Sequence, residues 1–125
     1  MLDSKKCIWI TGASTGIGKT LALKLAEEGY IVAASSRSTK NLLKLREESK
    51  NLKGSISIYP LDISLRNKCI LVFNKIEKEL GNIGTVILNA AINEPMHSQN
   101  FSSKKIKEII DVNYVGTVNT LEPVI

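Results

Sequence analysis

Apolar residues in this chain follow two patterns that alternate along its length. Short, nearly continuous apolar runs at residues 6–11, 31–35 and 85–89 predict buried strands of a parallel sheet. Residues 55–59 alternate between polar and apolar positions and end at Pro60, which predicts one more strand. The strand pattern therefore occurs four times, and a stretch of different periodicity follows each occurrence.

Helical spacing follows each predicted strand. In residues 16–28, Ile17, Leu21 and Leu25 recur every four positions, and Gly29 is a suitable stop for this helix. A second helix carries the leucines of residues 42–45, a third runs through Leu80, and a fourth continues toward Leu121. The residues expected to cap the last three helices are, in order, Ser38 or Thr39, Ser64, and Ser102 or Ser103.

The strand–helix unit, repeated without a linker, predicts parallel strands joined by right-handed crossovers. We expect an α/β fold with a doubly wound, Rossmann-type parallel sheet in the strand order 3-2-1-4. Residues 1–125 are expected to form a single domain. Ligands of such sheets bind at the carboxyl ends of the strands, where the strand order reverses. The first strand ends at this point.

A glycine-rich turn follows the first strand. Gly12, Gly16 and Gly18 lie between that strand and the first helix, where they allow a sharp bend and a close approach of the backbone to a ligand. The helix N-terminus would direct free N–H groups at an anion. The turn therefore predicts a phosphate site, and the alternative is a tight strand–helix connection with no ligand.

Composition narrows the class of ligand. The formal net charge is +5, but the lysines are scattered, so we expect no nucleic-acid partner. Cys7 and Cys69 fit an apolar core better than a disulfide framework, and His97 has no cluster of metal ligands around it. No apolar stretch reaches the roughly 20 residues that span a bilayer. We expect a cytoplasmic protein with no membrane partner and no metal.

The turn Thr11-Gly12-Ala13-Ser14-Thr15-Gly16-Ile17-Gly18 resembles that of the short-chain dehydrogenase/reductase family. Three further segments match in the family's order: Leu61-Asp62-Ile63, Asn89-Ala90-Ala91 and Asp111-Val112-Asn113. The resemblance covers essentially the whole chain. It implies that the turn binds the pyrophosphate of NAD or NADP, that Asp62 holds the adenine amino group and that residues 89–91 lie beside a cofactor ribose. It also implies that Asn113 holds a water of the proton relay, which makes it the expected catalytic residue.

Residues 35–38, Ser-Ser-Arg-Ser, follow the second strand, where nucleotide folds discriminate between the two cofactors. The segment has no acidic residue for a free 2′-hydroxyl, whereas Arg37 offers a fork of donors to a 2′-phosphate. We therefore expect NADP(H) rather than NAD(H), and the alternative is a solvated Arg37. The residues expected to bind the cofactor are Gly12, Ser14, Thr15, Gly16, Ile17, Gly18, Ser36, Arg37, Ser38, Asp62, Ile63, Asn89, Ala90 and Ala91.

The resemblance also implies a Tyr-x-x-x-Lys pair and a Ser beyond the last helix, which transfer the proton and orient a carbonyl or alcohol substrate. Tyr30, Tyr59 and Tyr114 are not followed by Lys four residues later. We expect the chain to be truncated after about four strands, incomplete relative to the family and inactive alone. Self-association or a second polypeptide would then cover the last helix and the exposed strand at 85–88. The alternatives are a non-catalytic NADP(H)-binding or interaction module and the remnant of a truncated gene.

Overall fold

The computed structural model describes residues 2–125, and its centre is a parallel sheet. Within this part of the chain four strands pair side by side: β1 (Cys7–Thr11), β2 (Ile31–Ser36), β3 (Ser55–Pro60) and β4 (Ile83–Ile87). Their order is β3-β2-β1-β4, and every pairing is parallel. This confirms the predicted α/β fold with a Rossmann-type, doubly wound sheet.

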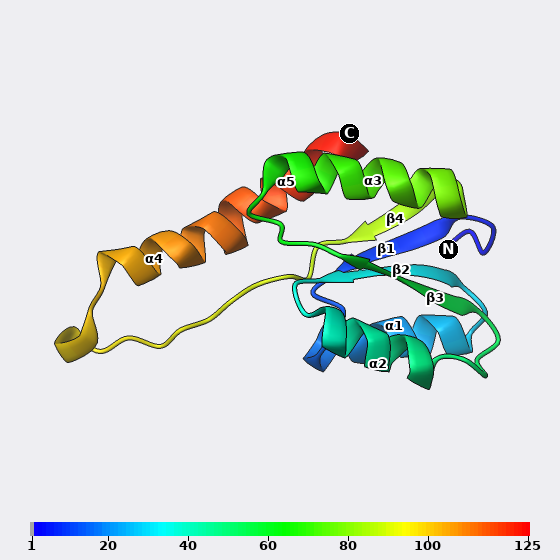
Figure 1. Cartoon of the computed structure of the whole chain (residues 1–125), viewed down its shortest axis with the longest axis horizontal. Coiled ribbons are helices and arrows are strands. Elements are labelled where there is room, and N and C mark those ends of the chain that lie inside the picture. The colour runs from blue at the N-terminus through cyan, green and yellow to red at the C-terminus, as the bar shows by residue number, and fades with distance from the viewer. Residues whose placement is uncertain (1) are drawn as a thin grey trace.

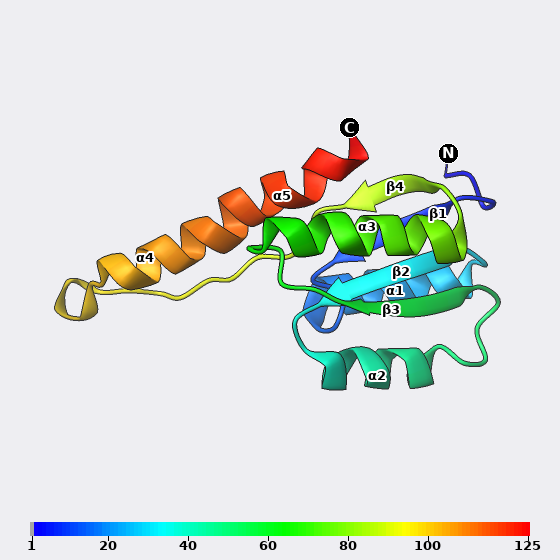
Figure 2. The same cartoon turned by 45° about the horizontal axis from the view of Figure 1, so that its top comes forward.

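Helices cover both faces of the sheet (Figure 1). α1 (Gly16–Glu27) and α2 (Thr39–Glu48) lie on one face, and α3 (Arg66–Leu80) lies on the other. The chain then passes along α4 (Ser103–Ile110), the π-helical segment η2 (Asp111–Gly116) and α5 (Thr117–Leu121). α4 projects away from the sheet, whereas α5 returns beside α3 (Figures 1 and 2).

β1 contributes side chains to two hydrophobic cores, one on each face of the sheet, because successive strand residues point to opposite faces. Ile8 and Ile10 pack with α1 and α2, whereas Cys7 and Trp9 pack with α3. All five residues of β1 are buried, as expected for a central parallel strand. The Trp9 indole N–H donates a 2.9 Å hydrogen bond to Ser35 Oγ, so its polar atom is satisfied within the core.

The two cysteines are free and fully buried, one on β1 and one on α3. Burial raises the pKa of the Cys7 thiol to about 11, which keeps it neutral. Both residues therefore pack as small apolar side chains, as the sequence indicated. None of the helices within residues 2–125 is long and apolar enough to cross a membrane.

Several element boundaries shift by one or two residues from the sequence-based expectation, and two of the differences have a clear cause. β4 begins at Ile83 rather than at residue 85, because Ile83 pairs with Cys7 and its N–H donates to the carboxylate of Glu77 at 3.2 Å. Ser64 was wrongly predicted as the cap of the third helix. Its hydroxyl and its N–H both bond to Asp62 Oδ1, at 2.7 and 3.0 Å, and α3 begins after Leu65.

Leu45 tests the core under α2. Its side chain is 0% exposed, whereas Leu43 on the same helix is 41% exposed. We expect Leu45→Ala to lower the free energy of unfolding by about 2–5 kcal/mol, because it leaves a cavity. Leu43→Ala, the control, should change it by less than about 1 kcal/mol. Urea denaturation followed by circular dichroism measures both changes, and equal losses would contradict this packing.

Candidate functional site

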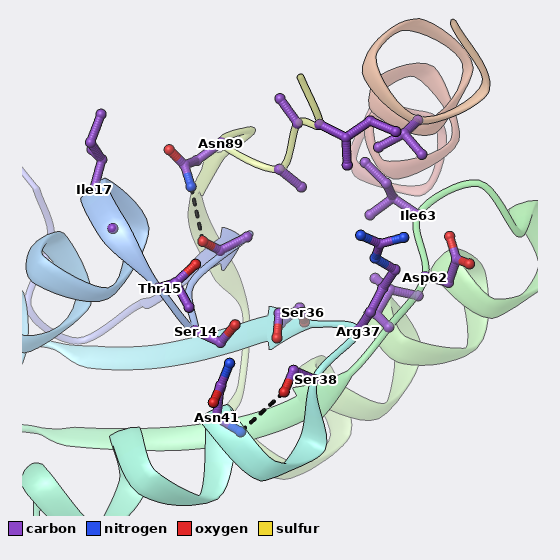
Figure 3. Close-up of a pocket in the computed structure, with 18 residues that line it drawn as sticks. Ser14, Thr15, Ile17, Ser36, Arg37, Ser38, Asn41, Asp62, Ile63 and Asn89 are labelled. Atoms are coloured by element: carbon purple, nitrogen blue, oxygen red, sulfur yellow. Dashed lines mark hydrogen bonds between the residues drawn. The ribbon is translucent and has the colours of Figure 1, made fainter. Parts of the chain in front are cut away.

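A cavity of about 590 Å³ opens at the carboxyl ends of the strands, where β1 lies between β2 and β4. This is the switch point at which doubly wound sheets bind ligands. Figure 3 shows the side chains around it. The cavity is lined by Gly12, Ser14, Thr15, Gly16, Ile17, Ser35, Ser36, Arg37, Ser38, Asn41, Leu61, Asp62, Ile63, Asn89, Ala90, Ala91, Ile92 and Val112.

The three glycines of the turn have different roles. A Cβ atom added to Gly16, whose φ is +54°, would meet no atom within 4 Å, so the turn is open there. At Gly12 the added Cβ would lie 2.8 Å from Ala90 Cα, and at Gly18 it would collide with the Gly12 carbonyl. Gly18 does not line the cavity, although we predicted it as a binding residue. Gly12 and Gly18 allow close packing, and Gly16 faces the ligand space.

The first turn of α1, which begins at Gly16, lines the cavity. Thr15 precedes the helix without a side-chain capping bond, and the first turn holds no acidic side chain. The first N–H groups of a helix have no partner within the helix, and its N-terminus carries a partial positive charge. This end of α1 can therefore accept an anion that approaches over Gly16.

Thr11 and Asn89 join the end of β1 to the segment after β4. Thr11 Oγ1 accepts hydrogen bonds from the backbone N–H groups of Asn89 and Ala90, both at 3.2 Å. Asn89 Nδ2 donates in return to the carbonyls of Thr11 and Gly12, at 3.2 and 3.0 Å. The Asn89 amide, predicted to lie beside a ribose, is thus directed at the glycine turn and fixes its position (Figure 3).

The last residue of β2 and the segment after it contribute uncharged donors and one cation. Ser36 Oγ is buried and has no hydrogen-bond partner within residues 2–125, although Ser36 lines the cavity. Ser38 caps α2 by accepting a 3.2 Å hydrogen bond from the Asn41 N–H. The exposed Arg37 side chain extends toward the end of the cavity lined by Asp62 and Ile63 (Figure 3). Ser35 and Asn41 also line the cavity, and the family motifs gave no signal for either.

Asp62 is held in place by the turn that follows β3. Both of its bonds to Ser64 use Oδ1, so Oδ2 is free to accept from a ligand. Leu61 and Ile63 on either side are buried and anchor the turn against the α3 core. One carboxylate oxygen of Asp62 therefore holds the turn, while the other is not used by it.

Asn113 does not line the cavity, whereas its neighbour Val112 does. From η2 it bonds both backbone groups of Ile92: Nδ2 donates to the carbonyl and Oδ1 accepts from the N–H, each at 2.8 Å. Ile92 lines the cavity, so Asn113 positions part of its wall. Its predicted contact with a water of a proton relay stays a prediction.

The tyrosines lie outside the cavity lining. Burial raises the pKa of Tyr59, and its 2.8 Å hydrogen bond to Glu79 raises it further. A tyrosine that transfers a proton near neutral pH needs a lowered pKa, so Tyr59 has the opposite character. Within residues 2–125 no group of three or more His, Cys, Asp or Glu side chains is placed to hold a metal ion.

A model of the short chain dehydrogenase family matches residues 6–125. The chain is 32% identical over 124 residues to the 3-oxoacyl-(acyl-carrier-protein) reductase FabG of Thermotoga maritima, covering 99% of this chain and 50% of that protein. It is 29% identical to an acetoacetyl-CoA reductase of Paracoccus denitrificans, covering 95% of this chain and 48% of that protein. The chain thus spans about half the length of the curated relatives it matches.

Solved structures share the fold. A short-chain type dehydrogenase/reductase of Mycobacterium marinum superposes with a TM-score of 0.89 at 30% identity, over 96% of this chain and 49% of that one. An alcohol dehydrogenase of Thermococcus sibiricus, complexed with 5-hydroxy-NADP, superposes with a TM-score of 0.87 at 30% identity, over 94% of this chain and 51% of that one.

The Thr11 hydroxyl tests how the turn is held. Thr11→Val keeps the shape of the side chain but leaves the N–H groups of Asn89 and Ala90 without their acceptor. We expect a loss of about 1–3 kcal/mol in the free energy of unfolding. Thr20→Val on the exposed surface of α1 is the control. It removes only a water-exposed 3.1 Å hydrogen bond to the Gly16 carbonyl, so it should change the free energy of unfolding by at most about 0.5 kcal/mol. Chemical denaturation measures both, and an unchanged Thr11→Val variant would contradict the role of this hydroxyl.

Proposed function

The chain belongs to the short-chain dehydrogenase family, and we propose that it binds NADP(H) as the cofactor-binding part of an oxidoreductase. When bound, this cofactor supplies or accepts the hydride that interconverts a carbonyl and an alcohol. The chain's own residues bind the dinucleotide and set its orientation at the carboxyl ends of the strands. The proposal rests on the open turn at Gly16, which lies against the N-terminus of α1.

The turn suits a pyrophosphate because it offers backbone donors and room. Any side chain at Gly16 would enter the space through which the phosphates reach the first turn of α1. Thr15 and Ser14, which also line the cavity, add hydroxyl donors on the same side. Backbone N–H groups hold a phosphate without bringing a charged side chain into the turn.

The adenosine end fits the opposite part of the cavity. Asp62 Oδ2 can accept from the adenine amino group, and the part of Ile63 that lines the cavity can contact the ring. Ala90, Ala91 and Ile92 line the other end, where a nicotinamide ribose would lie. Asn113 fixes the backbone of Ile92 and so acts as a positioning residue for this end.

Arg37 supports NADP(H) rather than NAD(H). It is the cation at the rim after β2, and residues 35–38 include no acidic side chain that would repel a 2′-phosphate. The Thermococcus sibiricus relative was crystallised with 5-hydroxy-NADP, which is consistent with this preference.

Turnover requires groups outside this sequence in our proposal. The 125 residues contain no Tyr-x-x-x-Lys, and no tyrosine lines the cavity. The same geometry also serves a non-catalytic NADP(H)-binding module, the second candidate. Carbonyl reduction by a preparation that contains the chain together with a partner polypeptide would favour the oxidoreductase.

Gly16 provides the first test. Gly16→Val should abolish NADPH binding, because the branched side chain would occupy the approach of the pyrophosphate. Gly81→Val is the matched control: Gly81 also has a positive φ, +83°, and open space around it, but it ends α3 away from the cavity. Gly81→Val carries at least as much backbone strain, because Gly81 has φ +83° and ψ −172°, a conformation that essentially only glycine adopts. NADPH titration by fluorescence measures the outcome, and unchanged affinity in Gly16→Val would refute the proposed site.

Arg37 provides the second test. Arg37→Ala should weaken NADPH binding by about 10- to 100-fold, because it removes charge-assisted hydrogen bonds, and should change NADH binding much less. Arg46→Ala, which removes an exposed cation of α2 that does not line the cavity, is the control. Isothermal titration of each variant with both cofactors measures the difference. Equal losses for the two cofactors would rule out the assignment of Arg37 to a 2′-phosphate.

A further inference from the structure

A second hollow of about 300 Å³ adjoins the cavity on the side of α2. Ser14, Thr15, Gly16 and Asn41 line both spaces, so the two are continuous. The two remaining residues of the smaller hollow are Lys19 from α1 and Lys44 from α2. No carboxylate lines it. We call this hollow the Lys44 subsite.

The charge of the Lys44 subsite comes chiefly from Lys44. Lys19 Nζ is 2.9 Å from the carboxylate of Glu48, which neutralises much of its charge. Among residues 2–125, no carboxylate lies within salt-bridge distance of Lys44. Asn41, Lys44 and Glu48 are three and four residues apart and share one face of α2. This face turns an amide and a free cation toward the glycine turn.

The Arg37 side chain points away from Asn41, and uncharged hydrogen-bond donors lie between the two residues (Figure 3). In Figure 3 this side chain extends toward Asp62 and Ile63, and the Asn41 amide is directed toward Ser14. Ser36 and Ser38 lie between these two groups in the same view. The Ser36 hydroxyl is buried without a partner, so it is a donor that the protein itself does not use.

We propose that the Lys44 subsite binds the phosphate monoester on the adenosine ribose of the cofactor, with Lys44 and Asn41 as specificity-determining residues. This inference rests on the proposed NADP(H) site and assigns a second side to its phosphate recognition. Arg37 approaches the phosphate from the adenine side, and Lys44 approaches it from α2. Asn41 and the serine hydroxyls donate between them. Lys19 can also attract the phosphate when its ion pair with Glu48 opens.

The exposure of Lys44 to solvent limits how much this residue can contribute to nucleotide affinity. Lys44 is exposed, so water screens its attraction for a phosphate. We therefore expect Lys44→Met to weaken binding of NADPH and of 2′,5′-ADP by about 3- to 10-fold. Binding of NADH and 5′-AMP, which lack the 2′-phosphate, should stay within about 2-fold. Raising the ionic strength should reduce the difference between the wild-type chain and this variant.

Two further variants separate this effect from a general one. Arg46→Met removes a cation from the same helix without altering either hollow and should leave all four affinities unchanged. Glu48→Gln should strengthen NADPH and 2′,5′-ADP binding, because Lys19 loses its partner and can turn to the phosphate. Opposite signs at two positions of one helix face would not arise from a loss of folding, which circular dichroism checks in each variant.

Isothermal titration of the full chain with the four nucleotides distinguishes the outcomes. Selective weakening by Lys44→Met together with strengthening by Glu48→Gln would support the Lys44 subsite. If NADPH and NADH both bind and Lys44→Met keeps the wild-type preference, the subsite is refuted and the proposed function stands. If the wild-type chain binds none of the four nucleotides, the proposed function fails and the subsite with it.

Discussion

The close contact between the ends of β1 and β4 is the constraint on which the site depends. The Thr11 hydroxyl and the Asn89 amide cross-link these two ends through backbone groups. The contact is possible only because Gly12 and Gly18 carry no side chain. It sets the direction in which the chain leaves β1, and α1 therefore begins with its N-terminus at the cavity. Packing therefore brings backbone donors to the cavity, at the place where we propose that the pyrophosphate binds.

The same strand supports the rest of the molecule. β1 is buried on both faces, so the cores under α1 and α2 and under α3 share it. Its residues alternate between the two cores, which fixes the strand in register and leaves its last residue, Thr11, at the edge of the cavity. The site is rigid at its centre because the strand that carries it belongs to both cores.

The sequence predicted the features that depend on local pattern. Strand order, helix positions and the glycine turn follow from periodicity and from residue types within a few positions of one another. The start of β4 depends on the Glu77 carboxylate, and Ser64 donates its hydroxyl to Asp62 instead of capping α3. The π-helical segment at Asp111–Gly116 leaves no mark in the apolar spacing. The packing role of Gly18 and the presence of Asn41 and Lys44 beside the turn depend instead on contacts between segments far apart in the sequence.

Charge is placed at the edge of the site and not at its centre. The turn itself offers backbone groups and hydroxyls, whereas the cations lie at the rim: Arg37 just after β2, Lys19 on α1 and Lys44 on α2. A cation within the turn would be desolvated between the packed backbones of residues 12 and 90, which is costly. At the rim it stays hydrated and acts only on a charge that reaches it. In the proposed site, affinity for the pyrophosphate and discrimination between nucleotides therefore depend on different residues. A substitution on α2 should then change the preference without disturbing the strand ends that hold the turn.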